Sequence, residues 1–351
     1  MDEVGYKVIS ESPKTVIWLV TSKCNLSCRH CYALPYRTEK DLGLNDILKL
    51  IDEASSIGVE HIHYTGGEPL MRDDIFDILN YTIAKGIEAS IFTNATLIND
   101  YIARRLSDLD IAIYTSIDGH NKQVYESVRG SGTWVRFLRG IKLLNEYGLY
   151  IHMNISVNEL NWRYVGDIVR KALELNASSI SLIPSMPAGN ALRNNVYIRP
   201  AHFEYAIKVA ADVARELGIA ISIWCTPFVP IITRSPYLSY RSCRDWDVLD
   251  ISPSGRVLIC DVLNIDVGNV VKLGIKGAWR VLKRNQLVKR IENPKLQEPC
   301  RSCQLRYFCK GGCYARAYLV LNNIEAPDPL CPRVHRFLLS MRVKKVLGSG
   351  T

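Results

Sequence analysis

The eleven cysteines are the residues of this sequence best suited to do chemistry, and they are unevenly distributed. Three lie near the start, at Cys24, Cys28 and Cys31, and the other eight lie between Cys225 and Cys331. An odd number of cysteines, in a chain whose first residues do not look like a secretory signal, argues for reduced thiols in the cytoplasm rather than a disulfide framework. Because thiolates are good ligands for iron and zinc, the spacing predicts two metal-binding regions separated by a cysteine-free scaffold.

The first group has the spacing CxxxCxxC and directly follows the strand-like apolar run 15–20. Three thiolates can hold three irons of a [4Fe–4S] cubane and leave the fourth iron open to a substrate or cofactor. Two other interpretations stay open. Structural zinc needs four ligands, of which His30 could be one, and an electron-transfer cluster normally has four cysteines.

Residues 14–223 alternate strand-like and helix-like segments. The expected strands are 15–20, 61–65, 88–93, 110–117, 150–157 and 179–184, and the expected helices are 45–57, 73–85, 98–106, 134–147, 162–175 and 202–217. Six βα units in succession predict an α/β fold with a parallel sheet and outer helices. Right-handed crossovers would curl the sheet into a barrel or partial barrel, and a doubly wound open sheet is the alternative.

The remaining chain differs in character. Gly and Pro residues interrupt its segments, and it contains eight cysteines and one expected hairpin with strands 248–251 and 257–259. We therefore expect two domains, 1–223 and 224–351, the second with a small core held together by metal and a basic C-terminal helix. Loops at the carboxyl ends of the first domain's strands are where βα enzymes place their chemistry.

The cysteine spacing, followed by the aromatic Tyr32, resembles the radical S-adenosylmethionine (SAM) superfamily. The resemblance implies a partial (β/α)6 TIM-like barrel in which Cys24, Cys28 and Cys31 hold a [4Fe–4S] cluster whose open iron chelates SAM. Reductive cleavage of SAM would give a 5′-deoxyadenosyl radical that abstracts a hydrogen atom from the substrate.

A second motif, Gly66-Gly67-Glu68-Pro69, ends the second strand and matches the family's GGEP motif, which binds the amino group of SAM. Glycines let the backbone approach a ligand closely, and Glu68 offers an acceptor to an ammonium group.

By the same resemblance, residues ending strands three and four also bind SAM. Asn94 lies in a Thr-Asn-Ala run where the family usually has Thr-Asn-Gly, so Ala95 replaces a glycine. Ser116, Asp118 and Arg129 would lie around the carboxylate and ribose of SAM. An ordinary turn at Asp118 is the alternative.

The later cysteines resemble the SPASM extension, which holds one or two auxiliary [4Fe–4S] clusters. The implied outer ligands are Cys300, Cys303, Cys309 and Cys331, and the implied inner ligands are Cys243, Cys260 and Cys313. Cys225, the remaining cysteine, is predicted to be the fourth inner ligand. Otherwise it is a buried thiol and the inner cluster has an open iron. Two zinc knuckles are the alternative for the whole region.

Asp261 directly follows Cys260. In sulfatase-maturating relatives, an Asp at this place takes a proton from the substrate radical centre. Asp261 is therefore a candidate catalytic base, and an Asp in a turn is the alternative.

The resemblance indicates the reaction type better than the substrate. The run 311–318 and the segment 328–332 resemble haem-pathway enzymes that act on tetrapyrrole propionates, and also peptide or protein maturases, including those of sulfatases and other metalloenzymes. We predict oxidative decarboxylation of a tetrapyrrole propionate, with peptide or protein maturation as the alternative. The short segment before Cys24 weighs slightly against a fused peptide-recognition domain. A non-catalytic iron–sulfur electron carrier or zinc scaffold is the alternative from another class.

The composition and net charge limit the kinds of binding partner that we expect. The 351 residues are 48% hydrophobic and 23% charged, which indicates a soluble globular protein, and no apolar run approaches the ~18–20 residues of a membrane span. The net charge of +9 comes from basic residues that gather late in the chain. They form either a solvated surface or a dock for an acidic partner. We expect a ferredoxin- or flavodoxin-type electron donor, and neither nucleic acid nor membrane as a partner.

Overall fold

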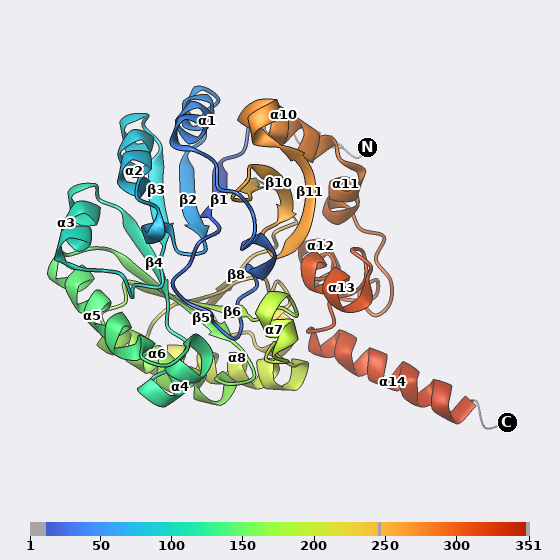
Figure 1. Cartoon of the computed structure of the whole chain (residues 1–351). Coiled ribbons are helices and arrows are strands. Elements are labelled where there is room, and N and C mark those ends of the chain that lie inside the picture. The colour runs from blue at the N-terminus through green and yellow to red at the C-terminus, as the bar shows by residue number, and fades with distance from the viewer. Residues whose placement is uncertain (1–11, 245–246, 349–351) are drawn as a thin grey trace.

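Within residues 12–244 and 247–348, which the computed structural model describes, eleven strands form one curled sheet (Figure 1). The strands paired in parallel are β1 (Thr15–Thr21), β2 (His61–Gly66), β3 (Glu88–Phe92), β4 (Ala112–Ser116), β5 (Ile151–Val157), β6 (Ser179–Pro184), β7 (Ile221–Ile223) and β8 (Leu238–Tyr240). They neighbour one another in chain order. A doubly wound sheet reverses its strand order at a switch point, so that alternative is wrong and the partial barrel is confirmed.

Helices cover the outer face of this arc (Figure 1). Those of the first part are α1 (Leu44–Ser56), α2 (Ile75–Ala84), α3 (Asp100–Asp108), α4 (Lys122–Arg129), α5 (Thr133–Glu146), α6 (Val165–Glu174), α7 (Gly189–Arg193) and α8 (Pro200–Leu217). Six of them follow the predicted positions within a few residues. The sequence analysis did not predict α4, although Asn121 caps it by accepting a hydrogen bond from the Val124 amide at 3.0 Å.

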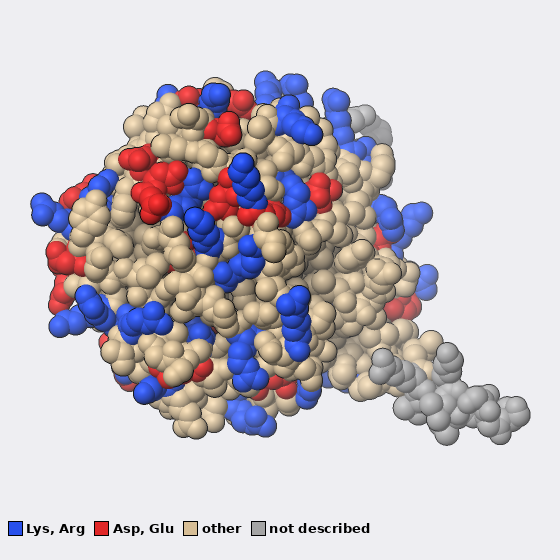
Figure 2. All heavy atoms as spheres, in the orientation of Figure 1, with Lys and Arg blue, Asp and Glu red and all other residues tan. Residues whose placement is uncertain are grey.

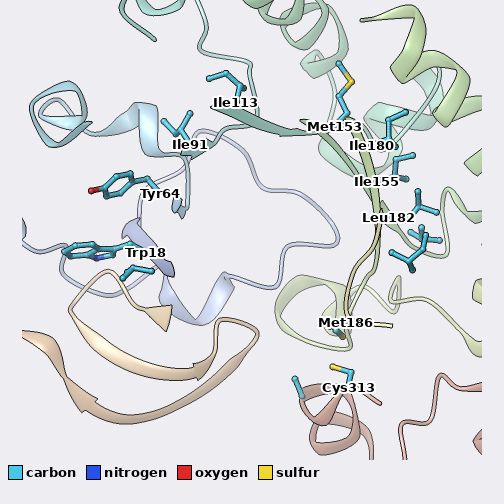
Figure 3. Packing of buried hydrophobic residues seen from close by; sticks show 14 of the residues in the cluster. Trp18, Tyr64, Ile91, Ile113, Met153, Ile155, Ile180, Leu182, Met186 and Cys313 are labelled. Atoms are coloured by element: carbon cyan, nitrogen blue, oxygen red, sulfur yellow. The ribbon is translucent and has the colours of Figure 1, made fainter. Parts of the chain in front are cut away.

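The apolar core lies between the strands and these helices. Side chains alternate along a strand, and Figure 3 shows Tyr64, Ile91, Ile113 and Leu182 pointing away from the centre of the arc. All four are completely buried. The other face of each strand therefore lines the interior of the partial barrel.

The later part of the chain extends the same sheet. β9 (Val248–Ile251) pairs in parallel with β1 and forms the predicted hairpin with β10 (Arg256–Cys260), which pairs with β11 (Leu263–Asn269). The remaining helices are α9 (Val229–Ile232), α10 (Val270–Arg284), α11 (Gln286–Glu292), α12 (Arg306–Cys309), α13 (Tyr314–Leu321) and α14 (Pro332–Gly348). The pairing of β9 with β1 brings the later cysteines to the barrel, and the division at residue 223 stays a prediction.

None of the helices in the described part of the chain is long and apolar enough to cross a membrane. The first eleven residues, where no secretory signal is expected, lie outside the described residues.

Candidate active site

The first cysteine loop and the Gly-Gly turn lie in contact at the carboxyl ends of β1 and β2. The Gly67 amide donates to the Thr21 carbonyl oxygen at 2.8 Å, and the Glu68 amide donates to the Lys23 carbonyl oxygen at 2.7 Å. A Cβ atom on Gly67 would lie 1.9 Å from the Lys23 oxygen. Only glycine permits this approach, so the turn and the residue before Cys24 are fixed relative to each other.

Glu68 is buried and ties this turn to the next loop. Its carboxylate accepts hydrogen bonds from the Thr93 hydroxyl at 2.7 Å and from the Asn94 amide at 2.7 Å. Burial raises the pKa of Glu68 to about 7, against the opposing effect of these hydrogen bonds. Glu68 thus holds the loop after β3 in place, in addition to any contact with a ligand.

Asn94 connects that loop to the cysteine loop. Its side-chain amide donates to Asn25 Oδ1 at 2.8 Å, and its Oδ1 accepts from the Thr96 amide at 2.9 Å. Because Asn25 directly follows Cys24, the ends of β1, β2 and β3 form one hydrogen-bonded network around the cysteines.

The predicted SAM residues at the end of β4 lie beside Cys28. Asp118 is completely buried and accepts from Arg129 Nε at 2.6 Å and from the Ser156 amide at 2.9 Å. Ser116 is also buried, two residues away. Asp118 is therefore not an ordinary turn residue, since it pairs with a cation inside the protein. This pairing brings Arg129 close enough to Cys28 to oppose the rise in the pKa of that thiol.

The donor set around the first three cysteines fits a three-thiolate cluster site. Burial raises the pKa of Cys28 to about 11, and the negative charges of Cys31 and Cys24 raise it further. Among the described residues, His30 forms no group of three metal-ligating atoms within 4.8 Å with these cysteines, and its Nε2 lies 3.4 Å from the carboxylate of Asp118. Burial lowers the pKa of His30 to about 4. The zinc interpretation thus loses its fourth ligand.

The structure brings Cys225 together with the three predicted inner cysteines. The pKa of Cys225 is raised first by burial and then by the charges of Cys313 and Cys243. The pKa of Cys260 is likewise raised by burial and, among other charges, by Cys313. Cys225, Cys243 and Cys260 therefore each lie near enough to Cys313 for its charge to raise their pKa, and four is the number of ligands that a closed cubane needs.

The four outer cysteines line one cavity. Its walls combine these cysteines with a few apolar side chains, two arginines and a glycine pair: Cys300, Cys303, Cys309 and Cys331, with Phe228, Ile231, Leu305, Val334, Arg306, Arg333, Gly311 and Gly312. The pKa of Cys300 is raised to about 12, first by burial and then by Cys331 and Cys303. Four thiols facing a common hollow match the predicted outer cluster.

One group of potential single-ion ligands among the described residues includes a cysteine, and it combines Cys260 with Asp250 and Asp261 rather than with other cysteines. Among the described residues, no three cysteine sulfurs lie within 4.8 Å of one another. A tetrahedral zinc with bonds of about 2.3 Å would hold its sulfurs about 3.8 Å apart. The spacing therefore fits a larger cluster better than a zinc knuckle.

A buried ion pair that the sequence analysis missed lies between the two auxiliary groups. Arg316 donates to both carboxylate oxygens of Asp328, at 2.8 and 2.6 Å, and to the Cys225 carbonyl oxygen at 3.0 Å. Asp328 also accepts from the Cys313 amide at 2.9 Å. This bidentate pair therefore holds the backbone at both Cys225 and Cys313. Both residues flank cysteines in segments already identified, but nothing in the sequence indicates that they pair.

Asp261 lies between the first cysteine group and the inner one. Its Oδ2 accepts from the Tyr32 hydroxyl at 2.6 Å, and its amide donates to Asp250 Oδ2 at 3.0 Å. Burial raises the pKa of Asp261, and burial together with the charge of Asp261 raises that of Asp250. The sequence analysis missed Asp250, which no motif marks. Its other carboxylate oxygen is buried without a hydrogen-bond partner.

Aromatic rings form an arc on the interior face of the barrel, which the sequence analysis also missed. The consecutive rings are those of His61, His63, Tyr114, His152 and Trp224, with centroids 6.3, 4.8, 4.7 and 5.3 Å apart. The last pair is stacked with an interplanar angle of 7°. The arc crosses the barrel from β2 through β4 and β5 to the residue after β7.

Lys and Arg side chains are spread over the face seen in Figure 2, with Asp and Glu among them. Several of the late basic residues are already paired: Lys283 with Glu292, Arg290 with Glu325, and Arg336 with Glu204 at 3.9 Å. These pairs favour the interpretation of a solvated surface over a single docking patch.

Comparisons with known proteins agree with this geometry. The sequence model of the Radical SAM superfamily matches residues 18–172, and that of the SPASM iron–sulfur cluster-binding domain matches residues 243–304. An AdoMet-dependent heme synthase of Oleidesulfovibrio alaskensis is 26% identical over 346 residues, covering 92% of this chain and 88% of its own. A PqqA peptide cyclase of Granulibacter bethesdensis is 24% identical over 336 residues, covering 92% and 87%.

A solved structure, native anSMEcpe with bound AdoMet and Cp18Cys peptide, has a TM-score of 0.75 at 20% identity and covers 96% of this chain and 99% of its own. The chain is a radical SAM enzyme. More narrowly, it belongs to the radical SAM enzymes that carry a SPASM domain. Its cofactors are SAM, a SAM-binding [4Fe–4S] cluster and auxiliary iron–sulfur clusters, and the non-catalytic alternative is excluded.

Proposed function

We propose that this enzyme oxidatively decarboxylates propionate side chains of a tetrapyrrole. The observation that carries the proposal is the arc of rings from His61 to Trp224, which offers a flat conjugated wall to a flat conjugated substrate. Peptides that bind as an added strand are instead recognised through main-chain hydrogen bonds and pockets for alternate side chains. The full-length similarity to a heme synthase supports the same assignment.

We assign the cofactors to residues as follows. The SAM-binding cluster is held by Cys24, Cys28 and Cys31. The inner auxiliary cluster is held by Cys225, Cys243, Cys260 and Cys313, and the outer one by Cys300, Cys303, Cys309 and Cys331. SAM is bound by Gly66, Gly67, Glu68, Pro69, Asn94, Ser116, Asp118 and Arg129.

When bound, the first cluster and SAM supply a carbon radical that removes one hydrogen atom from the substrate. Removal of a hydrogen atom from the β-carbon of a propionate, followed by loss of carbon dioxide, leaves a vinyl group and one electron. The auxiliary clusters are the groups in this chain suited to accept that electron.

The chain's own residues act by positioning the loops and charged groups around the cysteines. Glu68 and Asn94 hold the loops that follow β2 and β3 against the cysteine loop. Asp118 orients the guanidinium of Arg129 beside Cys28. Tyr32 donates to Asp261, which leaves the carboxylate of Asp261 between the first and the inner cysteine groups, where it can take a proton if the substrate yields one.

The test is turnover under anaerobic conditions. The reconstituted enzyme is incubated with SAM, a reductant and iron coproporphyrin, and 5′-deoxyadenosine and the porphyrin are quantified by mass spectrometry. Formation of 5′-deoxyadenosine together with vinyl porphyrin supports the proposal. Porphyrin that stays unchanged while the enzyme cleaves SAM overturns it.

The second candidate is peptide or protein maturation, which the similarity to a PqqA peptide cyclase favours. The same incubation with a precursor peptide encoded beside this gene tests it, since only a maturase would change the mass of the peptide. We also propose a ferredoxin- or flavodoxin-type electron donor. Replacing the chemical reductant in the assay by each protein, with its reductase, tests this.

A further inference from the structure

One serine hydroxyl joins the first two histidines of the ring arc. Ser90 Oγ lies 2.7 Å from His61 Nε2 and 2.6 Å from His63 Nδ1. A hydroxyl has a single proton to donate, so it serves one imidazole and accepts from the other. When His63 Nδ1 is the donor to Ser90, the Nε2 of the same ring carries a free lone pair.

The Nε2 of His63 faces accessible space. Within the described residues it has no hydrogen-bond partner, and it is not among the polar atoms buried without one. His152 differs, because Ser179 and Ser181 engage both of its nitrogens at 2.6 Å. A core histidine that only stabilises the fold would resemble His152. His63 instead directs one nitrogen into the barrel interior.

We propose that His63 Nε2 is an axial ligand to the iron of an iron-bearing tetrapyrrole substrate, whose macrocycle packs along Tyr114, His152 and Trp224. This inference rests on the proposed function and names the residue that would recognise the metal of that substrate. It concerns the iron of the substrate, and not the iron of any cluster.

The surroundings of His63 suit metal ligation. Metal-bound histidines usually have their other ring nitrogen held by a hydrogen bond, which fixes the tautomer and the ring orientation, and Ser90 provides that bond. The rings of Phe92 and Tyr114 lie edge-on to His63, with centroids 6.0 and 4.8 Å away, which further limits its rotation. Burial lowers the pKa of His63 to about 3, so the imidazole stays neutral and able to bind metal.

The position along the strand is also suitable. His63 lies three residues before Gly66, and thus about 10 Å along β2 from the turn next to the first cysteine loop. The iron of a metalloporphyrin lies at the centre of the macrocycle and its propionates at the rim. A ligand placed deeper in the barrel would direct the rim toward the SAM site.

The experiment uses the cluster-loaded enzyme with two probes, ferric coproporphyrin and metal-free coproporphyrin. Binding is followed by the porphyrin absorption band and by electron paramagnetic resonance of the ferric iron, after subtraction of the cluster spectra. The variants are H63A and H63Q, and H202A is the control because His202 lies on α8, outside the ring arc, and stacks on Trp162 with ring centroids 4.0 Å apart.

The expected result is an imidazole-ligated iron spectrum in the wild type and in H202A. H63A and H63Q should lose this spectrum and bind ferric coproporphyrin about tenfold more weakly or worse, a loss of about 1.4 kcal/mol. Because His63 is also one ring of the arc, their affinity for the metal-free probe should fall, but by much less than their affinity for ferric coproporphyrin. Added imidazole should restore the spectrum of H63A.

Two results overturn the inference. One is an unaltered iron spectrum in H63A. The other is the absence of histidine nitrogen coupling to the iron in wild-type enzyme labelled with 15N-histidine, a measurement that does not depend on how the variants fold. Failure of the proposed function looks different, since then the wild type would bind neither probe. Binding of both probes without dependence on His63 overturns the axial ligand alone.

Discussion

The ion pair between Asp118 and Arg129 allows a quantitative test of how the SAM site is held. Asp118 is completely buried and Arg129 is 7% exposed. In D118N, the new amide can still accept from the Ser156 amide, but its NH2 group faces the Arg129 donor. Removing one partner of a buried pair costs about 3–5 kcal/mol, because the other charge stays buried and uncompensated.

The double variant D118N/R129M should be no less stable than either single variant, because no charge is then left unpaired. The two substitutions should therefore be non-additive by about 3 kcal/mol. Urea unfolding of the cluster-loaded proteins, followed by tryptophan fluorescence and by cluster absorbance, measures this. Additivity within about 0.5 kcal/mol would refute the reasoning, since residues in direct contact should couple by more than that. SAM affinity, measured in parallel, separates a direct contact of Arg129 with SAM from loss of stability.

Three further predictions follow from single residues. G67A places a Cβ 1.9 Å from the Lys23 oxygen, so we expect its SAM affinity to fall by about tenfold or more. G43A is the control, because a Cβ at Gly43 meets nothing within 4 Å. Equal SAM affinity in the two variants would contradict the argument. C225S should change the Mössbauer spectrum of one auxiliary cluster and leave the others as they are; three unaltered clusters would mean that Cys225 is a buried thiol. Burial lowers the pKa of His152 from 6.5 to about 4. Between pH 6.5 and pH 4, His152 is therefore protonated in the unfolded chain but neutral in the folded protein, and lowering the pH favours unfolding. Stability should fall across this range, less steeply in H152Q, and equal thermal-unfolding profiles would count against the assignment.

The sequence predicted the barrel and the groups of cysteines for the same physical reason. Buried parallel strands are continuous apolar runs, and helices between them repeat at a different period, so local pattern determines both. Ligand spacing is also local, which is why Cys24, Cys28 and Cys31 could be identified together. The contact of Gly67 with the loop before Cys24 then follows from the pairing of β1 with β2.

What the sequence could not predict depends on contacts between distant segments. Asp250 acquires its environment only when β9 pairs with β1 and presents it to Asp261. The ring arc likewise depends on contacts between distant segments. The strand containing His61 and His63 was predicted, but which of its faces lines the interior depends on the curvature of the whole sheet, and the partners of these rings come from β4, β5 and the residue after β7.

Ala95 shows how such distant contacts determine a local conformation. The family usually has glycine here, and Ala95 adopts φ +60°, a left-handed conformation that costs a non-glycine residue about 1–2 kcal/mol. The bonds from Glu68 to Thr93 and Asn94 fix the chain on one side. On the other side, a Cβ on Gly140 of α5 would lie 2.1 Å from the Ala95 oxygen, so the helix packs directly on this peptide. The surrounding network therefore holds Ala95 in a left-handed conformation that glycine would adopt without this cost.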